Sequence, residues 1–353
     1  MSPAQSSKSD NGTDELPATM RALQARSFSL DGLQLGRRPI PTPRQGEILI
    51  RLRCASLNYR DLAVLTQNYY PDLQLPYVPA SDGCGEIVAL GPDVSEWAVG
   101  DRVTPVYIQG WRDGLPTAQM RAKGALGAPL EGVLQDYIVV PAADAVRAPT
   151  CLNDEEAATL PIAALTAWSA LADGGVGPDK TVLVQGTGGV SLFALQFAKA
   201  AGATVVVTSS SDEKLARVKA MGADHGVNYR THSDWPDVVR GLTKGRGVDL
   251  VVETGGSTLS ESLGTVAIGG FVAVVGFVAG YDAKIGLRQL LGPMVRLQGI
   301  VVGSRTRFEA MNRAIEAHKI KPVIDRRFTL EEGAAAFSYL AKAGHFGKIV
   351  VTL

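Results

Sequence analysis

A glycine-rich turn between a strand and a helix is the feature that most constrains how this chain can fold. Residues 181–184 are apolar or β-branched, and they lead through Gln185 into the sequence Gly186-Thr187-Gly188-Gly189-Val190-Ser191. A long apolar run follows over 192–201 and stops at Gly202, and a second β-branched run covers 204–208. The order of strand, glycine turn, helix, terminating glycine and strand predicts a βαβ unit.

Glycines at the first turn of a βαβ unit predict a site for a pyrophosphate. They let the phosphates approach the backbone, and the free N–H groups and dipole of the helix N-terminus favour an anion. The last position of the G-x-G-x-x-G pattern is Ser191, where Gly or Ala is usual and serine is the next smallest residue. The strand-turn-helix context favours a dinucleotide site over a βαβ unit that binds nothing. The residues of the turn that we predict to contact the dinucleotide are Gly186, Thr187, Gly188, Gly189 and Val190.

Length, charge and cysteine content exclude several classes of protein. A chain of 353 residues suggests about two domains. Acidic and basic residues balance at 35 each, so neither nucleic acid nor an acidic membrane is an expected partner. No apolar run reaches the ~18 residues of a membrane span. The three cysteines are widely spaced, which favours a reducing, cytoplasmic setting, and residues 1–19 are expected to be a disordered leader.

The pattern of segments changes near residue 153. Before it, short β-like runs such as Met20–Ala25 and Glu47–Leu57 predict an antiparallel, barrel-like domain, with a glycine-rich loop over Gly110–Gly132. After it, helical and strand patterns alternate, which predicts a doubly wound α/β domain. We therefore expect a nucleotide-binding domain over 153–304 and a mainly β domain over 20–152 and 305–353. We also predict a buried-type strand over Val295–Gly303 and a last helix, opened by a capping box at Thr329–Glu332, that runs to about Ala343.

Seven short motifs are spread between residues 58 and 225: Asn58-Tyr59-Arg60-Asp61, PASDGCGE at 79–86, VGDRV at 99–103, AATLP at 157–161, LTAW at 165–168, the Gly186 turn, and GADH at 222–225. Together they resemble the medium-chain dehydrogenase/reductase superfamily, in its zinc-free, quinone-oxidoreductase-like branch. The resemblance implies a GroES-like catalytic domain, a Rossmann domain and an active site in the cleft between them. It also implies a homodimer, paired through an edge strand near Val295 to Val302.

Metal ligands are missing from the positions where zinc-containing relatives carry them. Those relatives use a Cys and a His at the places that Asn58 and Ser81 occupy here. A structural zinc needs four closely spaced cysteines, whereas this chain has three cysteines in total and they are far apart. All four histidines come after residue 152. We therefore expect no bound metal.

The end of the second strand of the βαβ unit indicates the cofactor. NAD enzymes of this fold place an acid about 20 residues after the first glycine, and no acid stands at 206–209. Hydroxyl groups and an ammonium, which suit a 2′-phosphate, stand there instead, so NADP is expected. The stretch Ser210-Ser211-Asp212-Glu213 is also a capping box, so the alternative role for at least one of these serines is to cap a helix. The predicted NADP-discriminating residues are Ser209, Ser210, Lys214 and Tyr229.

Two side chains are candidates for the chemistry. Asn58 replaces a metal ligand and could donate a hydrogen bond to a reacting oxygen, or it could cap the backbone at a strand end. The stretch Gln67-Asn68-Tyr69-Tyr70-Pro71 resembles the enoyl-reductase stretch whose tyrosine is the proposed proton donor. Tyr70 is the predicted donor, Tyr69 is its alternative, and loop packing is a third reading.

The remaining predicted cofactor contacts follow from the family's motifs and from strands that should end near the cleft. They are Thr166, Gly276, Phe277, Gly303 and Ser304. The sequence as a whole predicts an NADPH-dependent, zinc-independent reductase of a conjugated carbonyl compound or a quinone. Two alternatives stay open: a metal-free alcohol or aldehyde oxidoreductase, and an NADPH-binding protein with little turnover.

Overall fold

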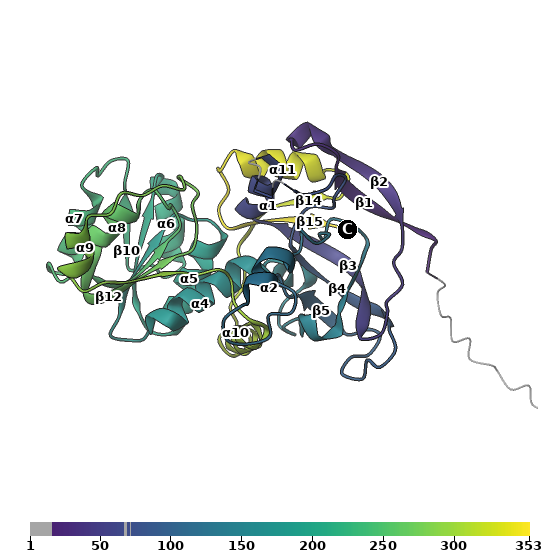
Figure 1. Ribbon diagram of the computed structural model, residues 1–353. Coiled ribbons are helices and arrows are strands. Elements are labelled where there is room, and N and C mark those ends of the chain that lie inside the picture. Colours follow the sequence, from purple (N-terminus) through teal and green to yellow (C-terminus); the bar gives the residue numbers. More distant parts are fainter. Residues whose placement is uncertain (1–15, 67–68, 71) are drawn as a thin grey trace, which may run out of the picture.

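The computed structural model describes residues 16–66, 69–70 and 72–353, which form two lobes, each built on its own β-sheet (Figure 1). Most of the predicted leader, residues 1–15, lies outside the described residues, as do Gln67, Asn68 and Pro71 of the predicted tyrosine motif. The prediction of a doubly wound domain joined to a mainly β, GroES-like domain is confirmed.

The mainly β lobe contains a seven-stranded sheet in which the C-terminal strands pair with strands from the first 150 residues. Its order is β14-β15-β3-β4-β5-β7, with β6 pairing on β3. The C-terminal strand β15 runs antiparallel to β3, with Ile349 opposite Leu57, so the last residues complete the sheet that the first domain begins. The strands are β3 (Glu47–Leu57), β4 (Asp82–Leu90), β5 (Arg102–Pro105), β6 (Tyr137–Pro141), β7 (Ala145–Arg147), β14 (Ile324–Thr329) and β15 (Lys348–Thr352); a hairpin of β1 (Thr19–Ala25) and β2 (Leu33–Pro39) lies beside them.

Short helices cover this sheet and connect its strands. Helix α11 buries Phe337 in the same apolar cluster as Ile50 and Leu65, so one core joins the end of the chain to its beginning. The helical elements are η1 (Leu30–Gly32), α1 (Tyr59–Thr66), α2 (Ala118–Lys123), η2 (Ala142–Asp144) and α11 (Gly333–Ala341).

The other lobe is a parallel sheet of six strands in the order β10-β9-β8-β11-β12-β13. Val182 and Val184 of β8 face one apolar cluster while Leu183 faces another, because helices cover both faces of the sheet. The order reverses between β8 and β11, and ligands of such sheets bind at the carboxyl ends of strands beside this point. The strands are β8 (Thr181–Gln185), β9 (Thr204–Ser209), β10 (His225–Asn228), β11 (Val248–Glu253), β12 (Val266–Val274) and β13 (Arg296–Gly299).

Helices α4, α5 and α10 lie on the side of this sheet that faces the other lobe (Figure 1). Helix α4 packs against both α5 and α10, which builds a common core between the lobes. The helices are α3 (Asp154–Ala157), η3 (Leu160–Ala164), α4 (Leu165–Gly174), α5 (Gly189–Ala200), α6 (Asp212–Ala220), α7 (Trp235–Leu242), α8 (Leu259–Thr265), α9 (Leu287–Leu291) and α10 (Arg305–His318).

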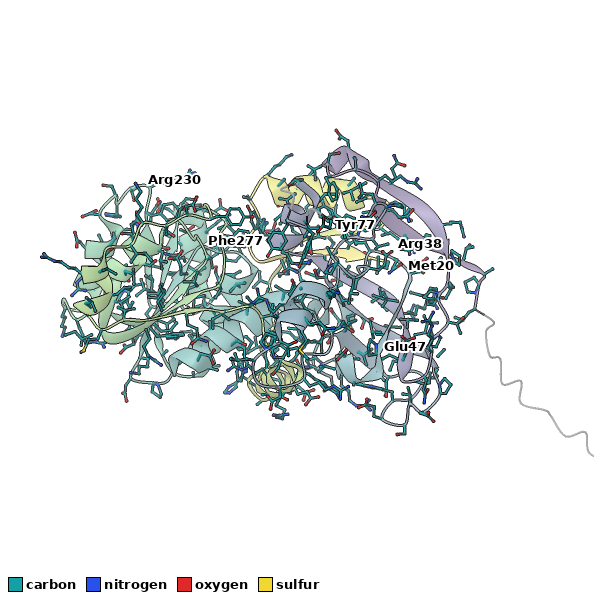
Figure 2. The ribbon with its side chains drawn as sticks, in the orientation of Figure 1. Met20, Arg38, Glu47, Tyr77, Arg230 and Phe277 are labelled. Atoms are coloured by element: carbon teal, nitrogen blue, oxygen red, sulfur yellow. The ribbon has the colours of Figure 1, made fainter. Side chains whose placement is uncertain are left out.

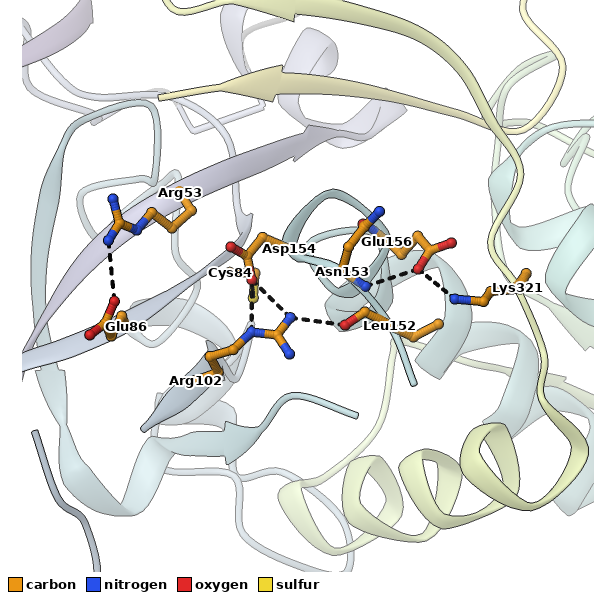
Figure 3. Close-up of polar contacts among 9 residues, drawn as sticks. All are labelled: Arg53, Cys84, Glu86, Arg102, Leu152, Asn153, Asp154, Glu156 and Lys321. Carbon is orange, nitrogen blue, oxygen red and sulfur yellow. Dashed lines mark hydrogen bonds and ion pairs between the residues drawn. The ribbon is translucent and has the colours of Figure 1, made fainter. Parts of the chain in front are cut away.

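Polar contacts also tie α3 to the segments around it (Figure 3). Asp154 accepts a hydrogen bond of 2.9 Å from Nε of Arg102, and Lys321 Nζ donates to Glu156 at 2.9 Å. These side chains are partly exposed, so each pair contributes at most about 1 kcal/mol and mainly fixes geometry. No helix in the described part of the chain has the length and apolar character of a membrane span.

Three local predictions are corrected. The strand predicted over Val295–Gly303 is only the four-residue β13, and all four of its residues are exposed because it is the edge of the sheet. Helix α11 begins at Gly333, and only half of the predicted capping box forms. The Glu332 side chain accepts from the N–H of Thr329 at 2.9 Å, but no side chain caps the N-terminus of the helix. The glycine-rich loop over 110–132 contains a short helix, α2.

Candidate functional site

The glycine turn after β8 has the geometry of an anion site. Gly186 has φ of 73°, a conformation that favours glycine, and Gly188 is the N-cap of the twelve-residue α5. The helix has no side-chain cap there, and a Cβ added to Gly188 would meet nothing within 4 Å. The space in front of the helix N-terminus therefore fits a pyrophosphate. Ser191 fits the close helix packing because its hydroxyl donates back to the Gln185 carbonyl at 2.6 Å.

The end of β9 brings the predicted 2′-phosphate residues together. Ser209 and Ser211 each accept a local backbone N–H, and Ser211 caps α6 by accepting from Lys214 N at 3.3 Å. The backbone N–H of Tyr229 donates to the Ser209 carbonyl at 3.1 Å, which places the half-exposed tyrosine beside the same strand end. Ser210 lies between the two bonded serines.

A turn from the other lobe docks onto this nucleotide-binding edge. The Lys214 ammonium donates to the His345 carbonyl at 3.0 Å, and Gly347 N donates to the Thr187 carbonyl at 3.0 Å. The guanidinium of Arg217 lies 3.7 Å from the centre of the Phe346 ring. Residues 345–347, which lead into β15, therefore form one wall of the predicted cofactor site, and no local sequence pattern indicates this wall.

Three of the predicted cofactor contacts have structural roles in this arrangement, and a fourth, Thr166, is buried. Thr166 is buried near the start of α4, and Ser304 caps α10 by accepting from Arg307 N at 3.3 Å. A Cβ on Gly303 would lie 2.7 Å from the Ser169 hydroxyl, and a Cβ on Gly276 would lie 2.8 Å from the Thr254 carbonyl. Both glycines are therefore needed for close packing, and any contact of these four residues with a cofactor stays a prediction.

An aromatic group bridges the two lobes at Phe277, which follows β12 and faces the mainly β lobe (Figure 2). Its ring stacks on Tyr281 at 4.4 Å and on Tyr69 at 6.3 Å, and it meets Tyr59 edge-on at 5.8 Å. Tyr69 is edge-on to Tyr70 at 5.2 Å. The structure thus brings both candidate proton donors and Phe277 into one group, with Tyr69 the more exposed tyrosine and nearer to the nucleotide-binding lobe.

The position of a zinc ligand in relatives is occupied here by a network around Ser81. Its hydroxyl donates to Asp61 Oδ1 at 2.9 Å and accepts from Arg60 at 2.8 Å. The same guanidinium donates to the carbonyls of Leu126 and Ala128, so the loop over 110–132 wraps around it. Burial raises the pKa of Asp61, and the nearby Arg60 charge opposes that rise.

Lys348, the first residue of β15, is a buried cation behind Asn58. It is 3% exposed and donates to the Leu57 carbonyl at 2.7 Å and to Asn58 Oδ1 at 2.6 Å. A lysine has donors only, so the Asn58 oxygen must face it and the amide nitrogen must face away. That nitrogen is shielded from solvent and lies near the Asp82 carboxylate, whose pKa it lowers. The prediction that Asn58 donates to a substrate therefore requires its amide to become accessible.

Asp82 lies on the other side of this network and completes it. It is fully buried and accepts from Ile162 N at 3.2 Å. Burial raises the pKa of Asp82 to about 7, while the Lys348 charge and the Asn58 amide act against the rise. Burial lowers the pKa of Lys348, and the carboxylates of Asp82 and Asp61 oppose that change.

Lys348, Asp82 and His345 are the residues that sequence reasoning missed. Asp82 stands inside the PASDGCGE motif at 79–86, which points only to the family resemblance and not to a role for this carboxylate. Lys348 and His345 carry no local signal, because a lysine before an apolar strand and a histidine in a turn usually face solvent. Their positions depend on contacts with Asn58 and Lys214, which are more than one hundred residues away.

Comparison with known proteins places this arrangement in a family. Residues 44–150 match the alcohol dehydrogenase GroES-like domain, and residues 189–317 match the zinc-binding dehydrogenase domain. The chain is 44% identical to Zinc-type alcohol dehydrogenase-like protein C1773.06c of Schizosaccharomyces pombe, over 87% of this chain and 91% of that protein. It is 30% identical to Prostaglandin reductase-3 of Mus musculus, over 89% and 83% of the two chains. The protein belongs to the medium-chain dehydrogenase/reductase superfamily.

Solved structures of this family superpose over nearly the whole chain. An NAD-dependent alcohol dehydrogenase is 34% identical with a TM-score of 0.85, covering 95% of this chain and all of that one. The mycobacterial protein Rv1454c, complexed with NADPH, is 26% identical with a TM-score of 0.80 and the same coverage. The fold and the glycine turn therefore define a nicotinamide-dependent oxidoreductase.

Proposed function

We propose that this protein is an NADPH-dependent, zinc-independent reductase that transfers hydride to a conjugated carbonyl compound or a quinone. The family and its oxidoreductase chemistry follow from the comparisons. The proposal concerns the choice of cofactor, the independence from zinc and the class of substrate.

The observation that carries the proposal is the presence of two cations at the family's metal position. Asn58 and Ser81 occupy two ligand positions, and Lys348 and Arg60 bond them at 2.6 and 2.8 Å. Amide and hydroxyl oxygens are poor zinc ligands, and the Asn58 oxygen already accepts a hydrogen bond from the Lys348 ammonium. No group of three or more His, Cys, Asp or Glu side chains in the described ranges is arranged to hold a metal.

Without a Lewis acid, a conjugated acceptor is the easier substrate. A bound nicotinamide supplies hydride, and in an enone or quinone the resulting negative charge delocalises onto oxygen. The phenol of Tyr70 is the proposed donor that completes the reduction of an enone by giving a proton to the carbon next to the carbonyl. Tyr69 is the alternative donor, and the stacked rings of Phe277 and Tyr281 offer an apolar surface to a conjugated substrate.

The serine-rich end of β9 supports NADPH as the cofactor. Ser209, Ser210 and Lys214 offer hydroxyl groups and an ammonium where NAD enzymes carry an acid. Lys214 forms no ion pair with any residue that the structure describes, so its charge is available to a 2′-phosphate. The solved structure of the mycobacterial relative complexed with NADPH supports this assignment.

A metal-free alcohol or aldehyde oxidoreductase is the second candidate, favoured by the resemblance to an NAD-dependent alcohol dehydrogenase. Product analysis separates the two functions. The purified protein is given NADPH or NADH with an enone, a quinone and an aldehyde, and the reduced bond is identified by mass spectrometry and NMR. We expect C=C or quinone reduction with NADPH, less than one zinc per chain, and rates unchanged by chelators. Reduction of only the C=O bond, or one zinc whose removal abolishes activity, would reject the proposal.

We also propose a homodimer formed through β13, in the cytoplasm. The strand is the open edge of the parallel sheet, and all four of its residues are exposed. Leu297 on the strand, Met294 before it, and Leu287 and Leu291 on the neighbouring α9 leave apolar side chains on the surface. An unpaired edge with apolar neighbours is a suitable surface for a second copy of the chain.

A further inference from the structure

The turn that docks on the nucleotide-binding lobe gathers basic side chains that lack acidic partners. Lys214 donates to a neutral carbonyl, that of His345, and Arg217 lies over the Phe346 ring. Neither side chain forms an ion pair within the described part of the molecule. Two positive charges beside one turn, without a compensating acid in contact, create a favourable potential for an anion.

His345 adds a third basic group to this cluster. Its Nδ1 atom is buried and has no hydrogen-bond partner among the residues that the structure describes. A buried polar atom without a partner is unfavourable, and a ligand that supplied the partner would remove that cost. The imidazole is close enough to Lys214 and Lys348 to feel both charges.

The position of the cluster indicates the class of anion. Lys214 opens α6 directly after the serine-rich end of β9, where this fold holds the adenosine ribose. The Lys214 ammonium lies 3.0 Å from the backbone carbonyl of His345, and its charge also acts on the imidazole, so a phosphate that contacts Lys214 lies near His345. We propose that His345 is a specificity-determining residue that, together with Lys214, binds the 2′-phosphate of the cofactor. This inference rests on the proposed use of NADPH.

The charges around His345 set the expected pH dependence. Burial lowers the pKa of His345, and Lys348 and Lys214 lower it further, while Asp325 on β14 acts in the opposite direction. The free protein therefore holds a neutral imidazole near pH 7. A bound dianion favours the imidazolium, so binding takes up a proton and affinity for the 2′-phosphate rises as the pH falls.

The test compares ligands with and without the 2′-phosphate. Calorimetry measures the binding of adenosine 2′,5′-bisphosphate and adenosine 5′-monophosphate at pH 6 and pH 8, to the unmodified protein and to His345→Gln. We expect the variant to lose about 10-fold or more in affinity for the bisphosphate at pH 6, less at pH 8, and little for the monophosphate. His318→Gln, an exposed histidine at the end of α10, is the matched control and should change neither ligand.

The outcomes separate this inference from the proposed function. If the unmodified protein shows no preference for the bisphosphate, both the NADPH assignment and the role of His345 are rejected. If it prefers the bisphosphate and His345→Gln keeps that preference and its pH dependence, only the role of His345 is rejected. Equal losses of affinity for the bisphosphate and the monophosphate would also reject the role of His345, since they indicate damage to the turn. Thermal unfolding and a second variant, His345→Asn, then show whether the turn still docks.

Discussion

Replacing Lys214 with methionine separates two roles that the structure gives to this side chain. Its ammonium ties the lobes together through the His345 carbonyl, and it is also the predicted ligand of the 2′-phosphate. Methionine keeps the length and apolar stem of the lysine but removes the charge. Loss of the hydrogen bond to the His345 carbonyl should weaken the binding of NADH and NADPH alike, whereas loss of the phosphate contact should weaken the binding of NADPH alone.

The expected magnitudes of the two effects differ. A partly buried hydrogen bond to a neutral carbonyl contributes about 1 kcal/mol, so Lys214→Met should weaken the binding of NADH by no more than about 5-fold. A charge-assisted contact with a phosphate is worth about 1.5–3 kcal/mol, which corresponds to about 10- to 150-fold for NADPH. The preference for NADPH over NADH should therefore fall by at least about 10-fold.

Steady-state kinetics with both cofactors, at saturating acceptor, measure this preference as a ratio of kcat/KM values. Lys219→Met, an exposed lysine on the same helix, serves as the control and should leave the ratio unchanged. A ratio that is unaltered in Lys214→Met, with both cofactors weakened equally, would show that Lys214 only joins the lobes. The NADPH assignment would then lose its main support.

Four further outcomes are expected. Tyr70→Phe should slow enone reduction by about 10²-fold and quinone reduction much less, while Tyr69→Phe should not; the reverse result assigns the proton to Tyr69. Asn58→Ala should raise the activation free energy of turnover by about 2.7–4 kcal/mol if the amide reaches the reacting oxygen. Unchanged kcat with a lowered melting temperature would instead give Asn58 a structural role. Because the folded-state pKa of Asp82 lies above its ordinary value of 3.8, stability should fall by up to about 4 kcal/mol as the pH rises from about 4 to about 7. Denaturant titrations at the two pH values should show this slope reduced in Asp82→Asn, and an equal slope contradicts the burial argument. Leu297→Asp should convert the proposed dimer to a monomer in light scattering, and a persistent dimer would place the interface elsewhere.

The sequence by itself determined the elements whose signals are local. The strand-turn-helix order at 181–200 places β8, the glycine turn and α5 correctly, because each depends on apolar periodicity and on glycine conformations over a few residues. The spacing of later helices and strands identified the doubly wound domain for the same reason. The metal-ligand positions could be located because the motifs around Asn58 and Ser81 are short and continuous.

Only the tertiary structure decided which side chains face one another across the cleft. Lys348 lies behind Asn58, and His345 lies beside Lys214, because β15 returns to pair with β3 and the turn before it docks on α6. The exposure of β13 likewise depends on its place at the edge of the sheet, which an apolar run of residues does not reveal. Local periodicity fixes a residue's place within an element. The partner that a charged group meets at the cleft depends on how distant segments pack, and here that packing places Lys348, a residue typical of the surface, in the core of the site.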